Sequence, residues 1–233
     1  MEDVAKQLLL DWPVNETFAE EEFLPSASNQ AAVKWIDEWP RWQRGGEAFH
    51  CLVIYGPEGC GKTHLSHVWQ RLSKAKIIDA VELANDNFLR DDTFVFIIED
   101  VDVVMKEPEI EEKLLHLYNW LKEQGGFLLL TSKVRPKKWQ IGLADLSSRM
   151  LACENVKIMP PDDALLKAVI KKQFSDRQIV LPEKVTNFLI KHADRSFSFV
   201  RSMVREIDQL SLSEKTKITI PVVKRVLSEM DTE

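Results

Sequence analysis

The residues with the clearest chemistry form one uninterrupted stretch, Gly56-Pro-Glu-Gly-Cys-Gly-Lys62-Thr63. Glycines at these spacings let backbone amides turn inward around phosphate oxygens, the lysine reaches the terminal phosphates, and the threonine hydroxyl is a ligand for Mg²⁺. The stretch therefore predicts a phosphate-binding loop for ADP or ATP with Mg²⁺, the alternative being a glycine-rich turn without a ligand. We expect nine residues to contact the nucleotide: Gly56, Pro57, Glu58, Gly59, Cys60, Gly61, Lys62, Thr63 and His64.

Two carboxylates stand where a nucleotide site needs them. Residues 94–98, Phe-Val-Phe-Ile-Ile, form an apolar run that ends at Glu99 and Asp100. A strand of this kind crosses the core and delivers carboxylates to the edge of the sheet where the phosphates bind. The alternative is that both residues begin a solvated loop, which Asp102 continues.

The elements that must position these residues alternate between short apolar runs and helical patterns. Continuous apolar strands separated by helices predict a parallel sheet that is covered on both faces. The apolar runs lie at 51–55, 77–78, 94–98 and 127–130, with an amphipathic helix over 110–121 between the last two. Ahead of them, Trp35, Trp39 and Trp42 follow a helical spacing that Pro40 interrupts. This tryptophan pattern is more typical of core packing than of a ligand-binding box.

After about residue 160 the sequence pattern is helical only. Apolar residues recur at helical spacing in four segments: 165–174, 185–189, 197–210 and 222–230. A small helical domain therefore follows an α/β domain. We expect three parts: an N-terminal segment over 1–28, an α/β nucleotide-binding domain over 29–160 and a helical domain over 161–233.

Charge and composition narrow the class of protein. The chain has 233 residues, 29% charged and 45% apolar, as in an ordinary globular protein. Residues 1–132 carry 12 basic and 24 acidic side chains, whereas 133–233 carry 19 and 13. The net charge of −6 is therefore the sum of an acidic half and a basic half of the chain. An acidic total argues against broad coating of DNA but leaves a local basic contact open.

The cellular compartment is predicted by what the sequence lacks. Its three cysteines form no CxxC pair, which favours a reducing compartment. The longest apolar runs are far shorter than the roughly 20 residues that a spanning helix needs, and the N-terminus lacks a secretory pattern. We expect a soluble cytoplasmic protein without membrane contact.

Several motifs together resemble the DnaA-type AAA+ initiators. They are the phosphate-binding loop with His64-Leu-Ser-His-Val-Trp69, Ile-Ile-Glu99-Asp100, Leu128-Leu-Leu-Thr-Ser132 with Arg135-Pro136, Asp145-Leu-Ser-Ser-Arg149, Pro161-Asp-Asp-Ala-Leu-Leu166 and Lys217-Ile-Thr-Ile-Pro221. The resemblance covers nearly the whole chain. It implies an α/β fold of the AAA+ P-loop NTPase type, with a parallel five-stranded sheet followed by a small all-helical lid domain.

The same resemblance assigns roles to individual residues. It implies that Phe18 lies in the linker that contacts the adenine and that Ser132 is the first sensor of the nucleotide. It implies that Glu99 binds Mg²⁺ together with Thr63, and that Asp100 orients the attacking water.

Among these proteins the chain is similar to the Hda (HdaA) family, which inactivates the initiator. The resemblance ends before the helix-turn-helix domain with which initiators read DNA. In the Hda family an N-terminal peptide docks on the sliding clamp, the beta subunit of DNA polymerase III. The matching residues are Gln7, Leu8, Leu10 and Trp12, which offer one hydrogen-bonding side chain and apolar anchors for a pocket. Alternatively, residues 8–10 pack on the core as a strand or helix fragment.

Arg149 is the residue that the resemblance places as an arginine finger. In the family such an arginine reaches the γ-phosphate held by a neighbouring subunit, and fingers supplied in trans accelerate hydrolysis by about 10³ to 10⁵. The alternative is an ion pair with Asp145, one turn earlier on the same helix.

Three departures from the family pattern concern hydrolysis by the chain itself. Glu99 stands where an aspartate is usual, and Lys133 follows the first sensor where an aspartate is common. Ser198 aligns with the second-sensor arginine, for which Arg195 and Arg201 are the nearest substitutes. We expect a site that binds nucleotide, holding ADP, and turns it over slowly.

Two functions fit these features. In the first, the chain is a negative regulator of replication initiation that docks on the clamp and stimulates ATP hydrolysis on the initiator through Arg149. Its partners are then the initiator, the clamp and a second copy of itself, with DNA contacted indirectly or weakly. In the second, it is a self-contained AAA+ ATPase, such as a helicase loader or a remodelling subunit. The missing second-sensor arginine favours the first.

Overall fold

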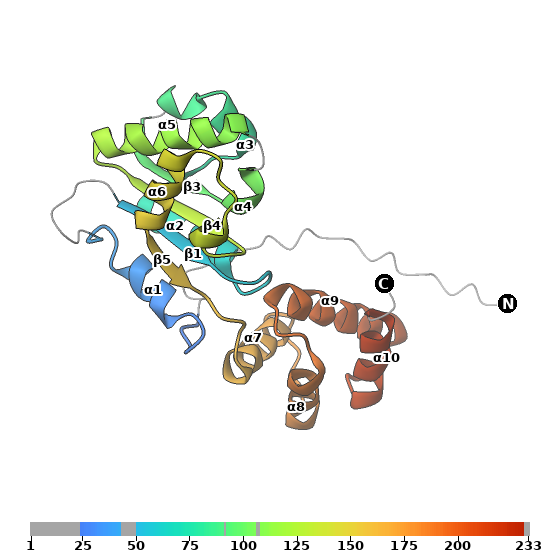
Figure 1. Ribbon diagram of the computed structural model, residues 1–233. Coiled ribbons are helices and arrows are strands. Elements are labelled where there is room, and N and C mark those ends of the chain that lie inside the picture. Colours follow the sequence, from blue (N-terminus) through green and yellow to red (C-terminus); the bar gives the residue numbers. More distant parts are fainter. Residues whose placement is uncertain (1–23, 43–49, 91, 106–107, 231–233) are drawn as a thin grey trace.

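The computed structural model describes residues 24–42, 50–90, 92–105 and 108–230. It consists of a sheet with helices on both faces, followed by a helical domain (Figure 1). Both parts were expected from the apolar pattern, and the predicted fold class is confirmed.

The sheet has five parallel strands in the order β2-β3-β4-β1-β5. Their bounds are β1 His50–Tyr55, β2 Lys76–Ile77, β3 Val95–Ile98, β4 Phe127–Ser132 and β5 Glu154–Lys157. The edge strand β5 has no apolar run because only its Val156 is buried. Only the family resemblance, and not the hydrophobic pattern, implied a fifth strand.

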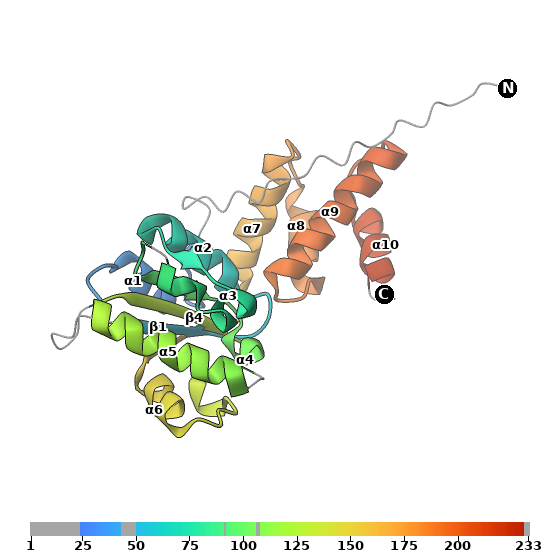
Figure 2. The same ribbon diagram turned by 90° about the horizontal axis from the view of Figure 1, so that it is seen from above.

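Helices cover both faces of the sheet, as Figure 2 shows for α1 and α2 on one side and α5 and α6 on the other. Strand residues alternate between the two layers, since Leu52 and Ile54 pack with α1 and α2 whereas Val53 packs with α5 and α6. The bounds are α1 Gln30–Asp37, α2 Lys62–Ser73, α3 Ala80–Ala84, α4 Val101–Val104, α5 Pro108–Gln124 and α6 Ala144–Ala152.

The tryptophans pack in the core, as predicted. Trp42 and Trp69 are 3% and 0% exposed, and their rings stack with centroids 5.1 Å apart. Trp39 meets Trp69 edge-on. Helix α1 ends at Asp37, so Trp39 and Trp42 lie beyond it and reach the core from the following segment.

Four helices form the second domain around a core of their own, which includes Leu166, Phe174 and Ile207. They are α7 Asp163–Asp176, α8 Glu183–His192, α9 Phe197–Glu214 and α10 Ile220–Met230. Asp162 caps α7 by accepting a hydrogen bond from the Leu165 amide at 2.8 Å. Ser196 caps α9 in the same way, with the Phe199 amide as donor at 3.1 Å.

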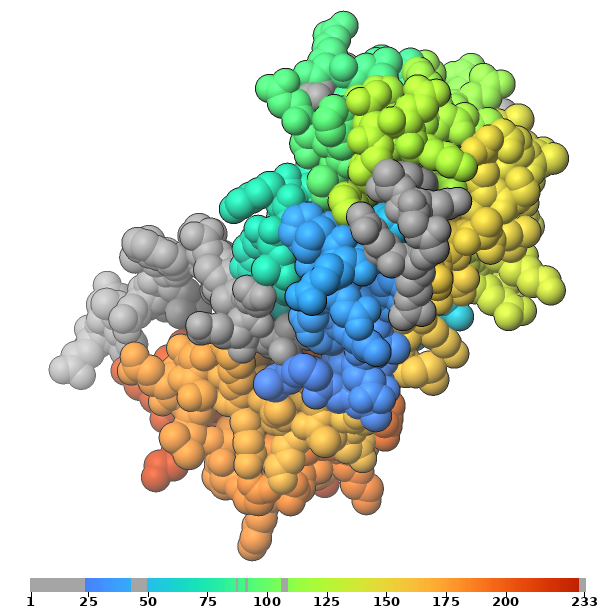
Figure 3. All heavy atoms as spheres, turned by 90° about the vertical axis from the view of Figure 1, so that its left-hand side faces the viewer, coloured from blue at the N-terminus to red at the C-terminus, as the bar shows by residue number. Residues whose placement is uncertain are grey.

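The two domains form separate lobes in Figure 3, with the orange helical domain below and the blue segment around α1 where the lobes meet. None of the helices in the described part of the chain is long and apolar enough to cross a membrane.

Candidate nucleotide-binding site

The predicted phosphate-binding loop connects β1 to α2 at the carboxyl edge of the sheet. The Gly56 amide donates to the Ser132 carbonyl at 3.1 Å, which ties the start of the loop to the end of β4. Gly59 and Gly61 have backbone φ angles of +70° and +101°, which residues other than glycine rarely adopt. The sequence therefore needs glycine at these two positions to close the loop onto the start of α2.

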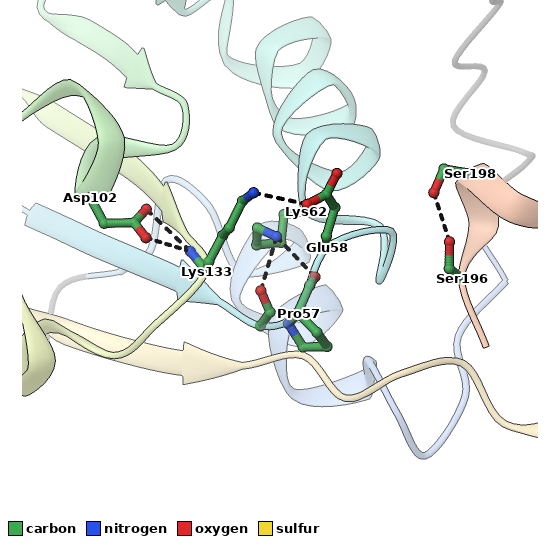
Figure 4. A network of polar contacts seen from close by, with 8 residues as sticks. Pro57, Glu58, Lys62, Asp102, Lys133, Ser196 and Ser198 are labelled. Atoms are coloured by element: carbon green, nitrogen blue, oxygen red, sulfur yellow. Dashed lines mark hydrogen bonds and ion pairs between the residues drawn. The ribbon is translucent and has the colours of Figure 1, made fainter. Parts of the chain in front are cut away.

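Lys62 lies inside this loop and is 7% exposed. Its ammonium donates to the carbonyl oxygens of Gly56 and Pro57, both at 3.0 Å (Figure 4). An ammonium has three donors, so one remains for a further acceptor. This geometry places the buried Lys62 ammonium on the inner side of the loop, where it can bind phosphate oxygens.

Glu99 follows β3 and faces α2. Its Oε1 lies 2.5 Å from Ser66 Oγ, and the same hydroxyl lies 2.8 Å from the carbonyl oxygen of Thr63. The carboxylate is thus held within the turn of α2 that begins at Thr63, the predicted Mg²⁺ ligand. Its Oε2 has no hydrogen bond to a described residue, so one carboxylate oxygen is available.

These residues fit a magnesium ion that is shared with phosphates. In the described ranges no three His, Cys, Asp or Glu side chains come together as a metal cage. Magnesium at nucleotide sites usually takes one or two protein oxygens together with phosphates and waters, so a full cage is not needed. Thr63 and Glu99 would supply those protein oxygens.

Asp100 has a left-handed backbone, with φ 45° and ψ 46°. Its amide donates to Thr131 Oγ1 at 2.9 Å, which fixes the turn that leaves β3 against β4. Asp100 therefore lies at the same edge of the sheet as the phosphate-binding loop, next to the Glu99 that precedes it.

Lys133 links three segments at this edge (Figure 4). Its Nζ donates to Glu58 Oε2 at 2.8 Å, and its backbone amide lies 3.2 Å from Asp102 Oδ1. The hydrogen bond to Lys133 lowers the pKa of Glu58, and the same contact raises the pKa of Lys133. Lys133 thus neutralises an acidic residue of the loop.

The helical domain contacts the loop directly. The amide of Phe197 donates to the Gly59 carbonyl at 2.7 Å. A Cβ at position 59 would lie 2.3 Å from Ser196 Oγ and 2.9 Å from Ser198 Oγ, so no side chain larger than that of glycine fits under the start of α9. Figure 4 shows Ser196 and Ser198 on the opposite side of Glu58 from Lys133.

Ser198, predicted to align with the second-sensor arginine, brings a hydroxyl close to the loop. Ser198 Oγ lies 2.7 Å from Ser196 Oγ. Of the two arginines considered as substitutes, Arg195 pairs with Asp163 at 2.8 Å, at the start of α7. Arg201 lies on the exposed side of α9.

Three other predicted nucleotide-binding residues have distinct surroundings. Ser132 is fully buried; its hydroxyl donates to the Val134 carbonyl and accepts from Trp139 Nε1 at 3.0 Å. Cys60 is 3% exposed, and burial raises the pKa of its thiol. His64 is half-buried in the first turn of α2.

Arg149 lies on α6, on the opposite face of the sheet from α2. Its Nε and Nη2 donate to the two carboxylate oxygens of Asp145 at 2.9 and 3.0 Å. These hydrogen bonds raise the pKa of Arg149, and its Cζ lies 5.4 Å from the ring centre of Tyr118 on α5. The predicted alternative, the pair with Asp145, is present, and it holds the guanidinium at the surface.

The residues predicted to bind the clamp and the adenine lie outside the described residues. They are Gln7, Leu8, Leu10, Trp12 and Phe18.

Sequence reasoning missed some contacts around the loop. Ser66 lies within the 64–69 motif, but the sequence assigned it no role. Its place beside Glu99 follows from the pitch of α2, which puts it one turn after Thr63. The contact of Phe197 with Gly59 joins residues far apart in the sequence. Lys133 was noticed as a departure from the family pattern, but its partner Glu58 was not predicted.

Comparisons with known proteins agree on the group to which this fold belongs. Residues 162–227 match the lid domain of Hda. The DnaA chromosomal replication initiator of Helicobacter acinonychis is 25% identical over 201 residues, which are 78% of this chain and 44% of the initiator. The chain thus spans less than half the length of that relative.

Solved structures have the same fold. Domain III of the replication initiation protein DnaA from Thermotoga maritima has a TM-score of 0.75 at 22% identity, covering 94% of this chain and 98% of that one. AMPPCP-bound DnaA from Aquifex aeolicus has a TM-score of 0.70 at 20% identity, covering 86% and 67%. At these identities the likeness shows the fold: an AAA+ sheet followed by a lid.

Proposed function

We propose that this chain, which is related to Hda and to the DnaA-type AAA+ initiators, is a negative regulator of replication initiation. It binds nucleotide and stimulates ATP hydrolysis on a DnaA-type initiator. The regulator itself is then a weak ATPase at most.

Nucleotide binding is supported by the loop and its surroundings. Lys62 offers a donor inside the loop, and Thr63 and Glu99 can share Mg²⁺ with the phosphates of ADP or ATP. The AMPPCP-bound relative of the same fold agrees with this assignment. Bound Mg²⁺ would neutralise phosphate charge, while the residues of the chain position the phosphates.

The observation that carries the regulatory proposal is the position of Arg149. It lies on the α5–α6 face, where it contacts Asp145 and Tyr118, whereas the phosphate-binding loop leads into α2 on the other face. An arginine placed in this way serves a phosphate held by another subunit better than one held by its own chain. The planar guanidinium fork can then stabilise the charge of a transferring phosphoryl group.

Slow hydrolysis by the chain itself is supported by the lid. Ser196, Phe197 and Ser198 approach the phosphate-binding loop, and the nearby Arg195 is paired with Asp163. A self-contained ATPase couples its lid to its own γ-phosphate through a cation, and a serine hydroxyl provides no positive charge there. The adaptor is therefore favoured over a helicase loader or remodelling motor.

The partners follow from the same proposal. Gln7, Leu8, Leu10 and Trp12 would dock on the polymerase III sliding clamp and so bring Arg149 to initiators near clamp-loaded DNA. A homodimer and a cytoplasmic location accompany this role. Contact with DNA would be indirect or weak and confined to a local basic surface, since an acidic chain does not coat DNA broadly.

Hydrolysis by the cognate initiator tests the proposal. It would be measured with this protein alone, with DNA-loaded clamp alone and with both, for wild type, Arg149→Ala and Gln7→Ala. Arg205→Ala is the matched control, because Arg205 is an exposed arginine on α9, away from α6. We expect stimulation that requires the clamp and that both test variants lose while the control keeps it. Rapid ATP turnover by this chain without clamp or initiator would instead establish the motor.

A further inference from the structure

The loop that connects β4 to α6 presents an unusual concentration of positive charge. Residues 133–140 read Lys-Val-Arg-Pro-Lys-Lys-Trp-Gln. The exposed members of this stretch are Lys133, Arg135, Lys137, Lys138 and Gln140, that is, four cations and one amide.

Three of these cations are available to a ligand. Lys133 is paired with Glu58, but the side chains of Arg135, Lys137 and Lys138 make no hydrogen bond or ion pair with any described residue. Most basic residues of the lid are paired by contrast, as Arg177 is with Asp208 and Arg225 with Glu214. These three cations, which we call the basic turn, therefore form a local cluster rather than part of a positive charge spread over the surface.

The backbone beneath the basic turn is firmly held. The Lys138 amide donates to the Arg135 carbonyl at 2.8 Å, and Pro136 between them is buried. Trp139 is 9% exposed, and its Nε1 donates to Ser132 Oγ and to the Val134 carbonyl. A turn fixed on its inner side loses little conformational freedom when its outer side binds a ligand.

The geometry points to a nucleic acid backbone, and we propose that the basic turn binds the phosphates of duplex DNA without sequence preference. Protein partners are usually held by apolar or aromatic anchors, and the exposed residues of 133–140 include none. Phosphates need only cations. A closed turn brings its first and fourth Cα atoms within about 7 Å, a length over which one DNA strand presents about two phosphates.

The net charge of −6 does not oppose this contact. At about 0.1 M salt the Debye length is roughly 10 Å, so acidic side chains elsewhere on the molecule are largely screened from a phosphate at the turn. The basic turn also packs next to α6, the helix that carries Arg149. DNA bound there would lie beside the surface proposed to meet the initiator, although binding itself does not depend on that function.

Binding of a fluorescein-labelled duplex of arbitrary sequence, followed by anisotropy over a range of salt concentrations, tests the site in the full chain. The test variant is Arg135→Gln with Lys137→Gln and Lys138→Gln. The matched control removes three exposed lid lysines: Lys184→Gln, Lys191→Gln and Lys217→Gln. Nucleotide binding and thermal unfolding of both variants verify that each is folded.

We expect weak binding by the wild type, with the logarithm of affinity falling linearly as the logarithm of salt rises. Each phosphate contact contributes about 0.9 to that slope, so loss of about two contacts in the test variant should reduce its magnitude by about 2, while the control reduces it little. Equal losses in both variants would indicate a general charge effect and overturn the proposal. Unchanged DNA binding in the test variant would also overturn it, even if binding to a protein partner were lost.

Discussion

Lys133 Nζ donates to Glu58 Oε2 at 2.8 Å and thereby joins the end of β4 to the phosphate-binding loop. Both side chains are well exposed, at 44% and 80%, so the pair contributes little to folding in water. Its consequence is local, because it balances a negative charge on the loop that we propose to bind phosphates.

Substitution of this pair should therefore change nucleotide affinity in opposite directions. Lys133→Ala leaves the Glu58 carboxylate unbalanced and should weaken ADP binding, whereas Glu58→Gln leaves a free cation and should strengthen it, each by about two- to fivefold. The double variant should bind about as wild type does. Calorimetric titration with ADP measures all three, and Lys137→Ala, a nearby exposed lysine, controls for loss of charge. Equal weakening by both single variants would show that the pair only maintains the loop.

The pH dependence of the pair has a defined sign. The folded-state pKa of Glu58 is lowered by Lys133, so the contribution of the pair is present above the ordinary glutamate pKa and is lost as pH falls through the lowered value. Carbon-13 NMR of the Glu58 carboxyl should show its pKa rise when Lys133 becomes Ala. An unchanged titration would place Lys133 away from Glu58 in solution.

Gly59 and Gly142 differ in the space that the structure leaves for a side chain. Alanine at 59 would need a left-handed backbone, costing about 1–2 kcal/mol, and its Cβ would meet Ser196 Oγ at 2.3 Å. Alanine at 142 would meet its nearest atom, Glu111 Oε2, at an ordinary 3.5 Å. We expect Gly59→Ala to displace the start of α9 and to weaken nucleotide binding at least tenfold, with Gly142→Ala close to wild type. Hydrogen exchange at residues 196–200 and ADP titration provide the measurements, and similar behaviour of the two variants would contradict the lid contact.

The sequence predicted the elements whose pattern is local. Lys62 and Thr63 lie in the predicted loop, and the buried strands read as apolar runs because both faces of the sheet are covered. The hydrophobic pattern did not predict edge strand β5, since a strand with one buried residue has no apolar run in its sequence. The contacts of Lys133 with Glu58 and of Phe197 with Gly59 depend on how distant segments meet, and no residue spacing encodes that.

Glu111 positions the segment that enters α6. It is 5% exposed, and its carboxylate accepts hydrogen bonds from the amides of Gly142 and Leu143 at 3.0 and 2.9 Å. Glu111→Ala removes both acceptors and should lower the free energy of unfolding by about 1–3 kcal/mol, while Glu111→Gln keeps one acceptor and should lose less. Denaturant unfolding measures the difference. If the alanine variant is as stable as wild type, the entry to α6 is held by its apolar contacts alone.

Substitutions of Asp145 and Arg149 can distinguish an arginine finger from an ion pair that only stabilises α6. An exposed pair four residues apart on a helix contributes only about 0.3–0.5 kcal/mol, so neither Asp145→Asn nor Arg149→Lys should unfold the protein. Asp145→Asn removes the pair but keeps the guanidinium, and we expect it to retain stimulation of the initiator's ATPase. Arg149→Lys keeps a positive charge but loses the planar guanidinium. If Arg149 is a finger, this variant should lose most of its stimulation of the initiator's ATPase, since Lys cannot reproduce the two directed donors.

If the pair served only to hold α6 together, Asp145→Asn would lose as much stimulation as Arg149→Ala. Comparing initiator hydrolysis among these variants, at matched clamp and DNA, therefore assigns Arg149 either to the neighbour's phosphate or to its own helix.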